Sequence, residues 1–390
     1  EYLWILLLLC SSYTVNSQNT YDVTEYGAVG DQKTDDSRAF LEAWAAACAA
    51  NTAKVAIVAP HGKTFLVKTA KFTGPCTASR LHFRVNGNVV APSSPWSNVS
   101  DYWLSFYHVH GLKVEGNGQI DGKGAIWWNR CPIQLGFVAC TNMLVKGIHL
   151  TNSPRSHFEL KFCSNVNITG VHISAPESSP NTDGIDISSS TYIYITDTQI
   201  SVEFNVGDDC IAVESGSSHI YITRVTCGPG HGISIGSLGV NGDQNATAEE
   251  IHVKDSIINS ATNGLRIKTW KGAGGYARHI SYTNVTLDST YNPIIIDQQY
   301  CPRKKCPNNS KTNANTVKIS DVSFTDIKGT IKGNIGVMLN CSTVVGCTGL
   351  VLKGINLTSA DAAGDITLSM CSNAHGEVYH TQPPVTCLVP

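Results

Sequence analysis

Two adjacent carboxylates stand directly before an apolar segment in the sequence NVGDDCIAV, residues 205–213. Carboxyl groups this close repel one another when both are ionised, so one of them can keep its proton near neutral pH. Glycoside hydrolysis uses one protonated and one ionised carboxyl group. The protonated group gives its proton to the leaving oxygen, and the ionised group activates water or attacks directly. Asp208 and Asp209 also suit a simple turn, because Gly and Asp are turn residues.

Other polar residues precede neighbouring apolar segments in the same way. Asp183 in NTD precedes GIDIS, His231 in GPGH precedes GISIGS, and the dipeptide at 263–264 precedes LRIKTW. Arg266 and Lys268 are two positions apart in one strand, so they point to one face. Each residue alone fits a turn or a solvated strand face. Together they predict one functional site, in which the two cations hold an anionic group and indicate a uronic-acid sugar.

An internal repeat must position these residues. The pattern apolar-x-apolar-x-x-apolar-x-apolar recurs eight times, and short second segments such as DGIDISS, CIAVES and HGISIGS lie between copies. The copies occupy residues 143–150, 166–173, 193–200, 220–227, 251–258, 280–287, 317–324 and 350–357. Alternating apolar and β-branched residues indicate strands, and the Gly, Asn, Asp and Ser between them indicate turns.

Short strands at this period predict an all-β fold, a right-handed parallel β-helix in which each repeat is one coil. Equivalent residues of neighbouring coils would then lie about 4.8 Å apart. A β-sandwich is the competing fold, but Asp183-Gly184 and Asn263-Gly264 open strands instead of joining hairpins. One helix is expected over residues 34–50, with Phe40, Trp44 and Cys48 on one face, as the cap of an open solenoid end.

Composition limits the classes of function. The chain has 390 residues, 42% of them hydrophobic, and a formal charge of −2. A nucleic-acid-binding protein would show a basic footprint, so we expect no nucleic acid as a partner. An acidic substrate instead requires a local basic site, which Arg266 and Lys268 could supply.

The first residues are typical of a secretory signal. An apolar run from Leu3 to Cys10 is too short to span a bilayer, and Val15 and Ser17 stand at −3 and −1 of a cleavage site. We expect a signal over residues 1–17, truncated at its start, and a single domain over residues 18–390. A buried N-terminal strand is the alternative. No other run is long enough for a membrane span.

Sequons and cysteines also favour an extracellular protein. The seven Asn-x-Ser/Thr sequons begin at Asn98, Asn167, Asn245, Asn284, Asn308, Asn340 and Asn356, so N-glycans are expected. The fourteen cysteines include three closely spaced late pairs, which predict disulfides: Cys301 with Cys306, Cys341 with Cys347, and Cys371 with Cys387. Zinc is the alternative, without a Cys-x-x-Cys spacing to support it. Thirteen cysteines remain without Cys10, so at least one thiol should be free.

The sequence resembles the plant-type polygalacturonases, glycoside hydrolase family 28, over about residues 20 to 390. The resemblance rests on SPNTDG, GDDC, CGPGHGISIGSLG, NGLRIKTW, NPIIIDQQYC and YGAVGDQKTDD. It implies a right-handed parallel β-helix that hydrolyses α-1,4 links of homogalacturonan with inversion. It also implies a secreted cell-wall enzyme, monomeric, with pectin as its partner, and with no metal or other cofactor.

The same resemblance implies roles for individual residues. Asp208 would be the general acid, Asp183 and Asp209 would activate the water, and His231 would tune the acid or aid substrate binding. The substrate-binding residues would be Arg266 and Lys268 at the galacturonate carboxylate, with Tyr300 and Asn181 at the sugar. Cys210 and Cys227 would form a disulfide beside the aspartates.

Three features depart from the family pattern. The stretch before GDD is a few residues longer than usual, Asp186 stands where plant members usually have His, and the segment after WWNRC is shorter, which leaves Cys131 without its usual partner. A calcium-dependent pectate lyase and a non-catalytic pectin-binding wall protein are the competing functions. The segment WLSFYHVHGLKVEGNGQIDGKGAIWW favours endo over exo cleavage.

Overall fold

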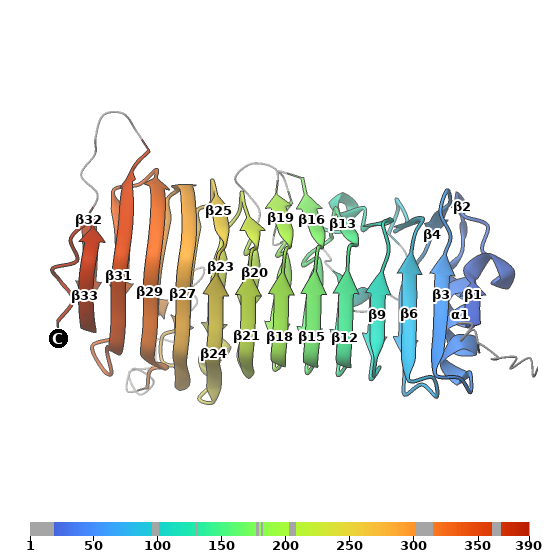
Figure 1. The fold of residues 1–390 in the computed structure, drawn as a ribbon, viewed down its shortest axis with the longest axis horizontal. Coiled ribbons are helices and arrows are strands. Elements are labelled where there is room, and N and C mark those ends of the chain that lie inside the picture. The colour runs from blue at the N-terminus through green and yellow to red at the C-terminus, as the bar shows by residue number, and fades with distance from the viewer. Residues whose placement is uncertain are drawn as a thin grey trace, which may run out of the picture.

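The protein is a long solenoid of parallel strands (Figure 1). The computed structural model describes residues 19–95, 101–128, 132–176, 179–180, 182–202, 208–301, 315–360 and 368–389. In Figure 1 the coils follow one another along the long axis, from α1 and β1 at the blue end to β33 at the red end. The expected signal segment, 1–17, lies outside the described residues.

The smaller of two sheets has eleven strands, one from each successive coil. In chain order these strands are β5 (Ala70–Thr73), β8 (Tyr102–Tyr107), β11 (Ile133–Val138), β14 (Phe158–Lys161), β17 (Ile185–Ser188), β20 (Ile211–Val213), β23 (Ile233–Leu238), β26 (Asn263–Trp270), β28 (Asn292–Tyr300), β30 (Ile335–Asn340) and β32 (Leu368–Ser372).

The larger sheet has 22 strands and forms the other walls of the solenoid. These strands are β1 (Asn19–Asp22), β2 (Asp31–Asp35), β3 (Lys54–Ala59), β4 (Thr64–Leu66), β6 (Arg80–Val85), β7 (Asn88–Val90), β9 (Leu112–Glu115), β10 (Gln119–Asp121), β12 (Thr141–Lys146), β13 (His149–Thr151), β15 (Ser164–Thr169), β16 (His172–Ala175), β18 (Thr191–Thr196), β19 (Gln199–Val202), β21 (Ser217–Thr223), β22 (Thr226–Cys227), β24 (Ala246–Lys254), β25 (Ile257–Asn259), β27 (Gly275–Thr290), β29 (Lys318–Ile331), β31 (Cys347–Ser359) and β33 (Ala374–Gln382).

The prediction of a parallel solenoid is confirmed, and the β-sandwich is wrong. The eight repeat copies lie on β12, β15, β18, β21, β24, β27, β29 and β31, each beside the next in the large sheet. The second segments form β17, β20, β23, β26 and β28 of the small sheet. The chain joins parallel strands by coil turns because each coil can bury its apolar side chains only against its neighbours.

Stacked apolar side chains fill the interior. In the small sheet Ile185 pairs with Ile211, which pairs with Ile233, and all three are fully buried. Residues on either side of each isoleucine point outward, because side chains alternate along a strand. The outer face of the small sheet therefore displays a fixed column of side chains, one from each coil.

One α-helix covers the N-terminal end, as predicted. α1 (Ser37–Ala49) buries Ala39, Phe40, Ala43, Trp44 and Ala47. It begins three residues later than the expected 34–50, because residues 31–35 form β2. Asp36 does not cap the helix, since its carboxylate accepts the N–H groups of Val29 and Gly30 instead.

The short 3-10 helices are η1 (Val23–Tyr26), η2 (Gly124–Ile126) and η3 (Val240–Gly242). None of the helices among the described residues has the length and apolar character that crossing a membrane requires.

The disulfides follow the sequence predictions in part. Cys210–Cys227, Cys341–Cys347 and Cys371–Cys387 are bonded as expected. Cys301 is also disulfide-bonded, but its expected partner Cys306 lies outside the described residues. A further bond, Cys48–Cys76, ties α1 to the strand region beside it and was not predicted. Cys140 and Cys163, buried on adjacent coils, are free thiols, whereas Cys131 lies outside the described residues.

Truncation of a core aromatic should destabilise the N-terminal coils. Phe106 is 1% exposed, with Phe72 at 4.9 Å and Phe137 at 5.3 Å between ring centroids. We expect Phe106→Ala to cost about 3–5 kcal/mol, because it leaves a cavity in a packed stack. Thermal unfolding followed by circular dichroism measures this. Phe162→Ala, at a ring that is 57% exposed, should leave the melting temperature nearly unchanged, and equal effects would contradict the assignment of the stack to the core.

Candidate active site

The coil register brings the predicted polar residues to one level. β17, β20 and β23 pair in parallel with Ile185, Ile211 and Ile233 side by side. Two positions earlier on each coil stand Asp183, Asp209 and His231. The Gly184 N–H also donates to the Asp209 carbonyl at 2.9 Å. The longer stretch before GDD therefore leaves the stacking of Asp183 on Asp209 intact, although residues 203–207 lie outside the described residues.

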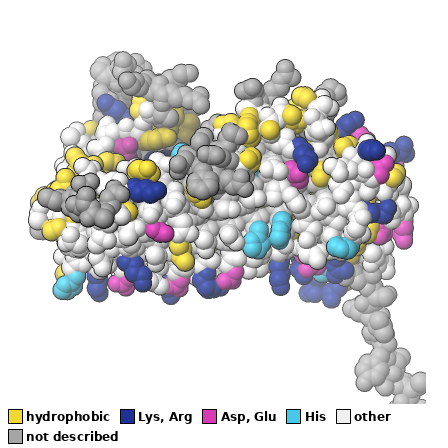
Figure 2. All heavy atoms as spheres, turned by 90° about the horizontal axis from the view of Figure 1, so that it is seen from above, with side chains coloured by type: hydrophobic (Ala, Val, Ile, Leu, Met, Phe, Trp, Pro, Cys, Tyr) yellow, Lys and Arg dark blue, Asp and Glu magenta, His cyan; other side chains and the backbone are white. Residues whose placement is uncertain are grey.

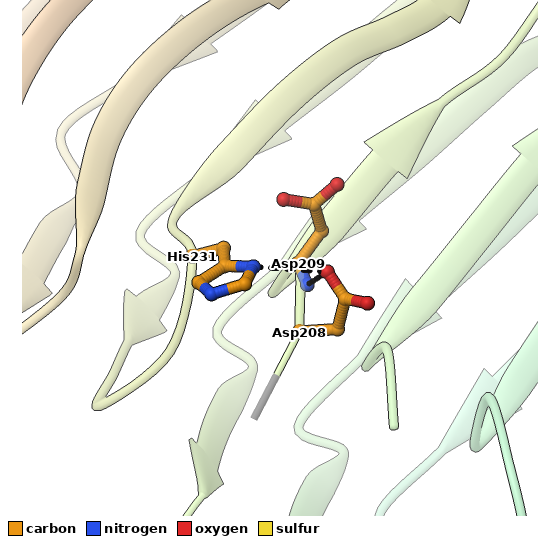
Figure 3. Close-up of side chains that lie close together, drawn as sticks. All are labelled: Asp208, Asp209 and His231. Carbon is orange, nitrogen blue, oxygen red and sulfur yellow. Dashed lines mark hydrogen bonds and ion pairs between the residues drawn. The ribbon is translucent and has the colours of Figure 1, made fainter. Parts of the chain in front are cut away.

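A single main-chain N–H joins two of the carboxylates. The Asp209 N–H donates to Asp183 Oδ1 and to Asp208 Oδ1, each at 3.1 Å. Figure 3 shows the Asp208 carboxylate turned toward His231, whereas the Asp209 carboxylate points away from both. Adjacent residues thus present their acids in different directions, so the two aspartates of GDD meet different surroundings.

Asp208 and His231 form a pair that reaches the surface. His231 Nδ1 lies 3.0 Å from Asp208 Oδ1, and the side chains are 33% and 29% exposed. Burial alone would raise the pKa of Asp208, but the hydrogen bond and positive charge of His231 outweigh it. The pKa of Asp208 is therefore held below its usual value.

The turn that carries His231 depends on glycine. Gly232 has φ +71°, and a Cβ there would lie 2.2 Å from the carbonyl oxygens of Asn263 and Gly264. Only glycine lets the backbone pass this close to the next coil while it turns. The glycine after His231 therefore fixes the position of the imidazole beside Asp208.

Asp209 is buried against both predicted cations. Its side chain is 3% exposed; Arg266 Nη2 donates to Oδ1 at 2.6 Å, and Lys268 Nζ donates to Oδ2 at 2.6 Å. The Ser234 hydroxyl donates to Oδ1 at 2.8 Å and accepts from Arg266 Nε at 2.9 Å. The structure thus joins Arg266 and Lys268 to the aspartates, and their remaining N–H groups are the ones free to meet a substrate.

Tyr300 and Asn181 are the other two predicted substrate-binding residues, and the structure describes only the first. The Lys268 ammonium lies 5.6 Å from the centre of the Tyr300 ring, within cation–π range. Tyr300 therefore belongs to the same surface as the cations. Asn181 lies outside the described residues.

Asp183 has two neighbours that sequence reasoning did not assign to the site, Asp186 and His157. Burial, and then the charges of Asp186, Asp208 and Asp209, raise the pKa of Asp183 well above its usual value. Burial lowers the pKa of His157 to about 4, and this ring lies 3.1 Å from the Asp183 carbonyl oxygen. The sequence identifies Asp186 only as a departure from the family pattern. Its interaction with Asp183, three residues earlier on the same coil, does not follow from the repeat.

The described site does not suit a metal ion. Asp208, Asp209 and His231 offer ligand atoms within 4.8 Å of one another. Asp209, however, already binds two cationic side chains, and their charges would repel a divalent ion at the same carboxylate. The donor set is better suited to proton transfer and to binding an anion.

Removal of one buried cation should destabilise the fold. We expect Lys268→Met to cost about 3 kcal/mol, the lower end for breaking a buried ion pair, because Arg266 still compensates Asp209. The double variant Asp209→Asn/Lys268→Met should not recover this loss, because the Arg266 guanidinium then loses its carboxylate partner. Chemical denaturation midpoints test both.

Lys254→Met is the matched control for this series. Lys254 is 61% exposed and lies 3.8 Å from Asp255, a geometry worth little in water. A loss of stability in this control as large as that in Lys268→Met would contradict the assignment of the cost to the buried pair.

Comparison with known proteins gives consistent findings. The sequence profile of glycosyl hydrolases family 28 matches residues 48–381. A probable polygalacturonase of Arabidopsis thaliana is 41% identical over 95% of this chain and 81% of its own length. A polygalacturonase of Prunus persica is 37% identical over 98% of this chain and 97% of its own length. The fold is similar to that of an endo-xylogalacturonan hydrolase from Aspergillus tubingensis, with a TM-score of 0.75, 24% identity, and coverage of 94% of this chain and 99% of that one.

Proposed function

The chain belongs to glycosyl hydrolases family 28, and from this membership we propose that it hydrolyses the α-1,4 links of homogalacturonan, the polygalacturonate backbone of pectin. One observation carries the proposal: the Asp209 N–H joins the carboxylates of Asp183 and Asp208. His231 pairs with Asp208, and Arg266 and Lys268 pair with Asp209. This arrangement combines a proton donor, a base and an anion-binding site on one face.

We assign the role of general acid to Asp208. It is the more accessible of the two aspartates in the close-up, and its hydrogen bond to His231 lets the two residues share one proton (Figure 3). The hydrogen bond and charge of His231 outweigh burial and lower the pKa of Asp208 in the free site. As negative charge develops on the leaving glycosidic oxygen, Asp208 gives that oxygen the proton that it shares with His231 across the 3.0 Å hydrogen bond.

We assign the role of base to Asp183 and an anchoring role to Asp209. Both oxygens of Asp209 are engaged by donors, and its side chain is 3% exposed, so it is poorly placed to accept the proton of a water molecule. Asp183 is less buried and belongs to the coil beside Asp208. Asp209 instead holds Arg266 and Lys268 in place, and these cations with Tyr300 and Asn181 would contact the galacturonate.

The proposed location is extracellular, in the cell wall. Four disulfides with both partners described support an oxidising compartment. Three sequon asparagines, Asn167, Asn284 and Asn356, lie exposed on strands of the large sheet. Figure 2 shows Lys, Arg, Asp and Glu interspersed along the lower long edge, without a continuous basic surface. We propose a secreted monomer with pectin as its partner.

Loss of the acid should separate catalysis from binding. We expect Asp208→Asn to lower kcat on polygalacturonate by at least 100-fold, in the usual range for a general acid, because the amide cannot give up a proton. Binding of oligogalacturonide, measured by calorimetry, should stay within a few-fold. The wild-type assay, in the presence of a chelator, must yield reducing ends without ultraviolet-absorbing products. Unsaturated products would indicate a lyase, and absence of turnover over mildly acidic pH would favour the binding protein.

The stereochemical outcome is a second test. Asp183 and Asp208 accept the same N–H at 3.1 Å each, so these oxygens lie closer together than the lower limit of about 6.5 Å usual for inverting pairs. We still expect inversion, because Asp183 is assigned to activate water and both oxygens of Asp209 are engaged by donors. Proton magnetic resonance of the first reducing ends should show the β-anomer. Initial release of the α-anomer would establish retention and a covalent intermediate.

A further inference from the structure

Asp186 contains a buried oxygen that no described group satisfies. It lies on β17 between Ile185 and Ile187, which point inward, so its side chain belongs to the outer column of the small sheet. The residue is 8% exposed. The Ser156 hydroxyl donates to Oδ2 at 2.5 Å, but Oδ1 has no donor among the described residues. A buried carboxylate oxygen without a donor is costly, so this atom requires an explanation.

The neighbour of Asp186 is another acid, the catalytic candidate Asp183. A hydrogen bond between the two carboxyl groups is among the causes of the pKa shift of each. Two ionised carboxylates cannot form a hydrogen bond, since both only accept. One proton placed between them removes the repulsion and gives the unsatisfied Asp186 Oδ1 a partner.

The surroundings favour Asp186 as the carrier of this proton. Asp183 accepts the Asp209 N–H, which stabilises its ionised form, although burial and the neighbouring carboxylates raise the pKa of Asp183 overall. Asp186 forms no ion pair with a Lys or Arg of the described chain, and Glu159 is its direct partner on β14. Burial and then the charge of Glu214 raise the pKa of Asp186 to about 7, so the proton is present at mildly acidic pH.

Several other charged groups surround this coil. Those on or beside the strands that pack against β17 are Glu159, Lys161, Asp208, Asp209 and Glu214. Arg155, Lys161 and Lys268 act on Glu214 only as more distant charges, and partial desolvation with the charge of Glu159 raises the pKa of Glu214. His157 stays neutral in this range, since its pKa is lowered to about 4. Asp183 and Asp186 therefore take up one proton as a unit.

We propose that Asp186 is a positioning residue for the reaction: its carboxyl group carries a proton on Oδ1, donates it in a hydrogen bond to Asp183, and so keeps Asp183 ionised and oriented as the base. The inference rests on the proposed function, because it assumes that Asp183 is the base. Ser156 fixes the opposite edge of the Asp186 carboxyl group, so that the donated hydrogen points at Asp183 and not at solvent.

The test compares an amide with an aliphatic side chain of similar size. Asp186→Asn keeps an N–H donor that cannot ionise, whereas Asp186→Leu removes the donor. We expect Asp186→Asn to stay within about threefold of wild-type kcat near pH 5 and to lose less activity than wild type between pH 6 and pH 8. Asp186→Leu should lower kcat about tenfold or more with little change in KM, since the residue does not touch the sugar.

A stability measurement separates this inference from the activity. The folded-state pKa of Asp186 is raised from 3.8 to about 7, so its contribution to stability is complete below about pH 4 and is lost as pH rises through about 7. The melting temperature of the wild type should therefore fall between pH 5 and pH 8 by more than that of Asp186→Asn. Asp197→Asn, at an exposed carboxylate in the turn between β18 and β19, is the matched control and should follow the wild type.

The outcomes are distinct. The inference would be overturned if the activity and the melting temperature of Asp186→Asn fell at alkaline pH as much as those of the wild type. Equal loss of kcat in the Asn and Leu variants would also overturn it. Absence of wild-type turnover on polygalacturonate would instead overturn the proposed function. The melting temperatures would still report in that case whether Asp186 carries the shared proton.

Discussion

The parallel register between successive coils is the constraint on which the site depends. Ile185, Ile211 and Ile233 stack in the interior, and that stack alone decides which residues of neighbouring turns meet outside. A shift of one residue would turn the isoleucines outward and separate Asp183 from the Asp209 N–H. Packing of the core and assembly of the acids are therefore one event, and no separate framework has to hold the carboxylates together.

The structure compensates four neighbouring acids by three different physical means. Asp209 binds two cationic side chains and a hydroxyl group, and Asp208 binds an imidazole at the surface. For Asp183 and Asp186, a shared proton best accounts for the lack of a cationic partner among the described residues. A single means for all four would give them similar affinities for protons. Different partners at each carboxylate separate these affinities, which acid–base chemistry by closely spaced carboxyl groups requires.

Much of this could be predicted from the sequence because a solenoid converts sequence spacing directly into spatial neighbours. The repeat identified the strands and put Asp183, Asp209 and His231 at one level. The different surroundings of Asp208 and Asp209 could not be predicted, because they depend on which way each side chain turns at the start of β20. The role of Asp186 could not be predicted for a related reason. It lies within a strand of alternating apolar and polar residues, and only its contact with Asp183 indicates its role. The free thiols Cys140 and Cys163 were likewise hidden, since pairing of cysteines depends on geometry and not on their count.

The place of the site along the solenoid has a consequence for its persistence. β17, β20, β23 and β26 are the fifth to eighth of the eleven strands of the small sheet, with α1 over the first coils and the Cys371–Cys387 bond near the last. Because a coil is held mainly by its two neighbours, loosening begins at the ends and spreads inward one coil at a time. The outer coils thus unfold before the central ones. A molecule whose terminal coils are unfolded or cleaved by proteases therefore retains the folded coils that carry the site.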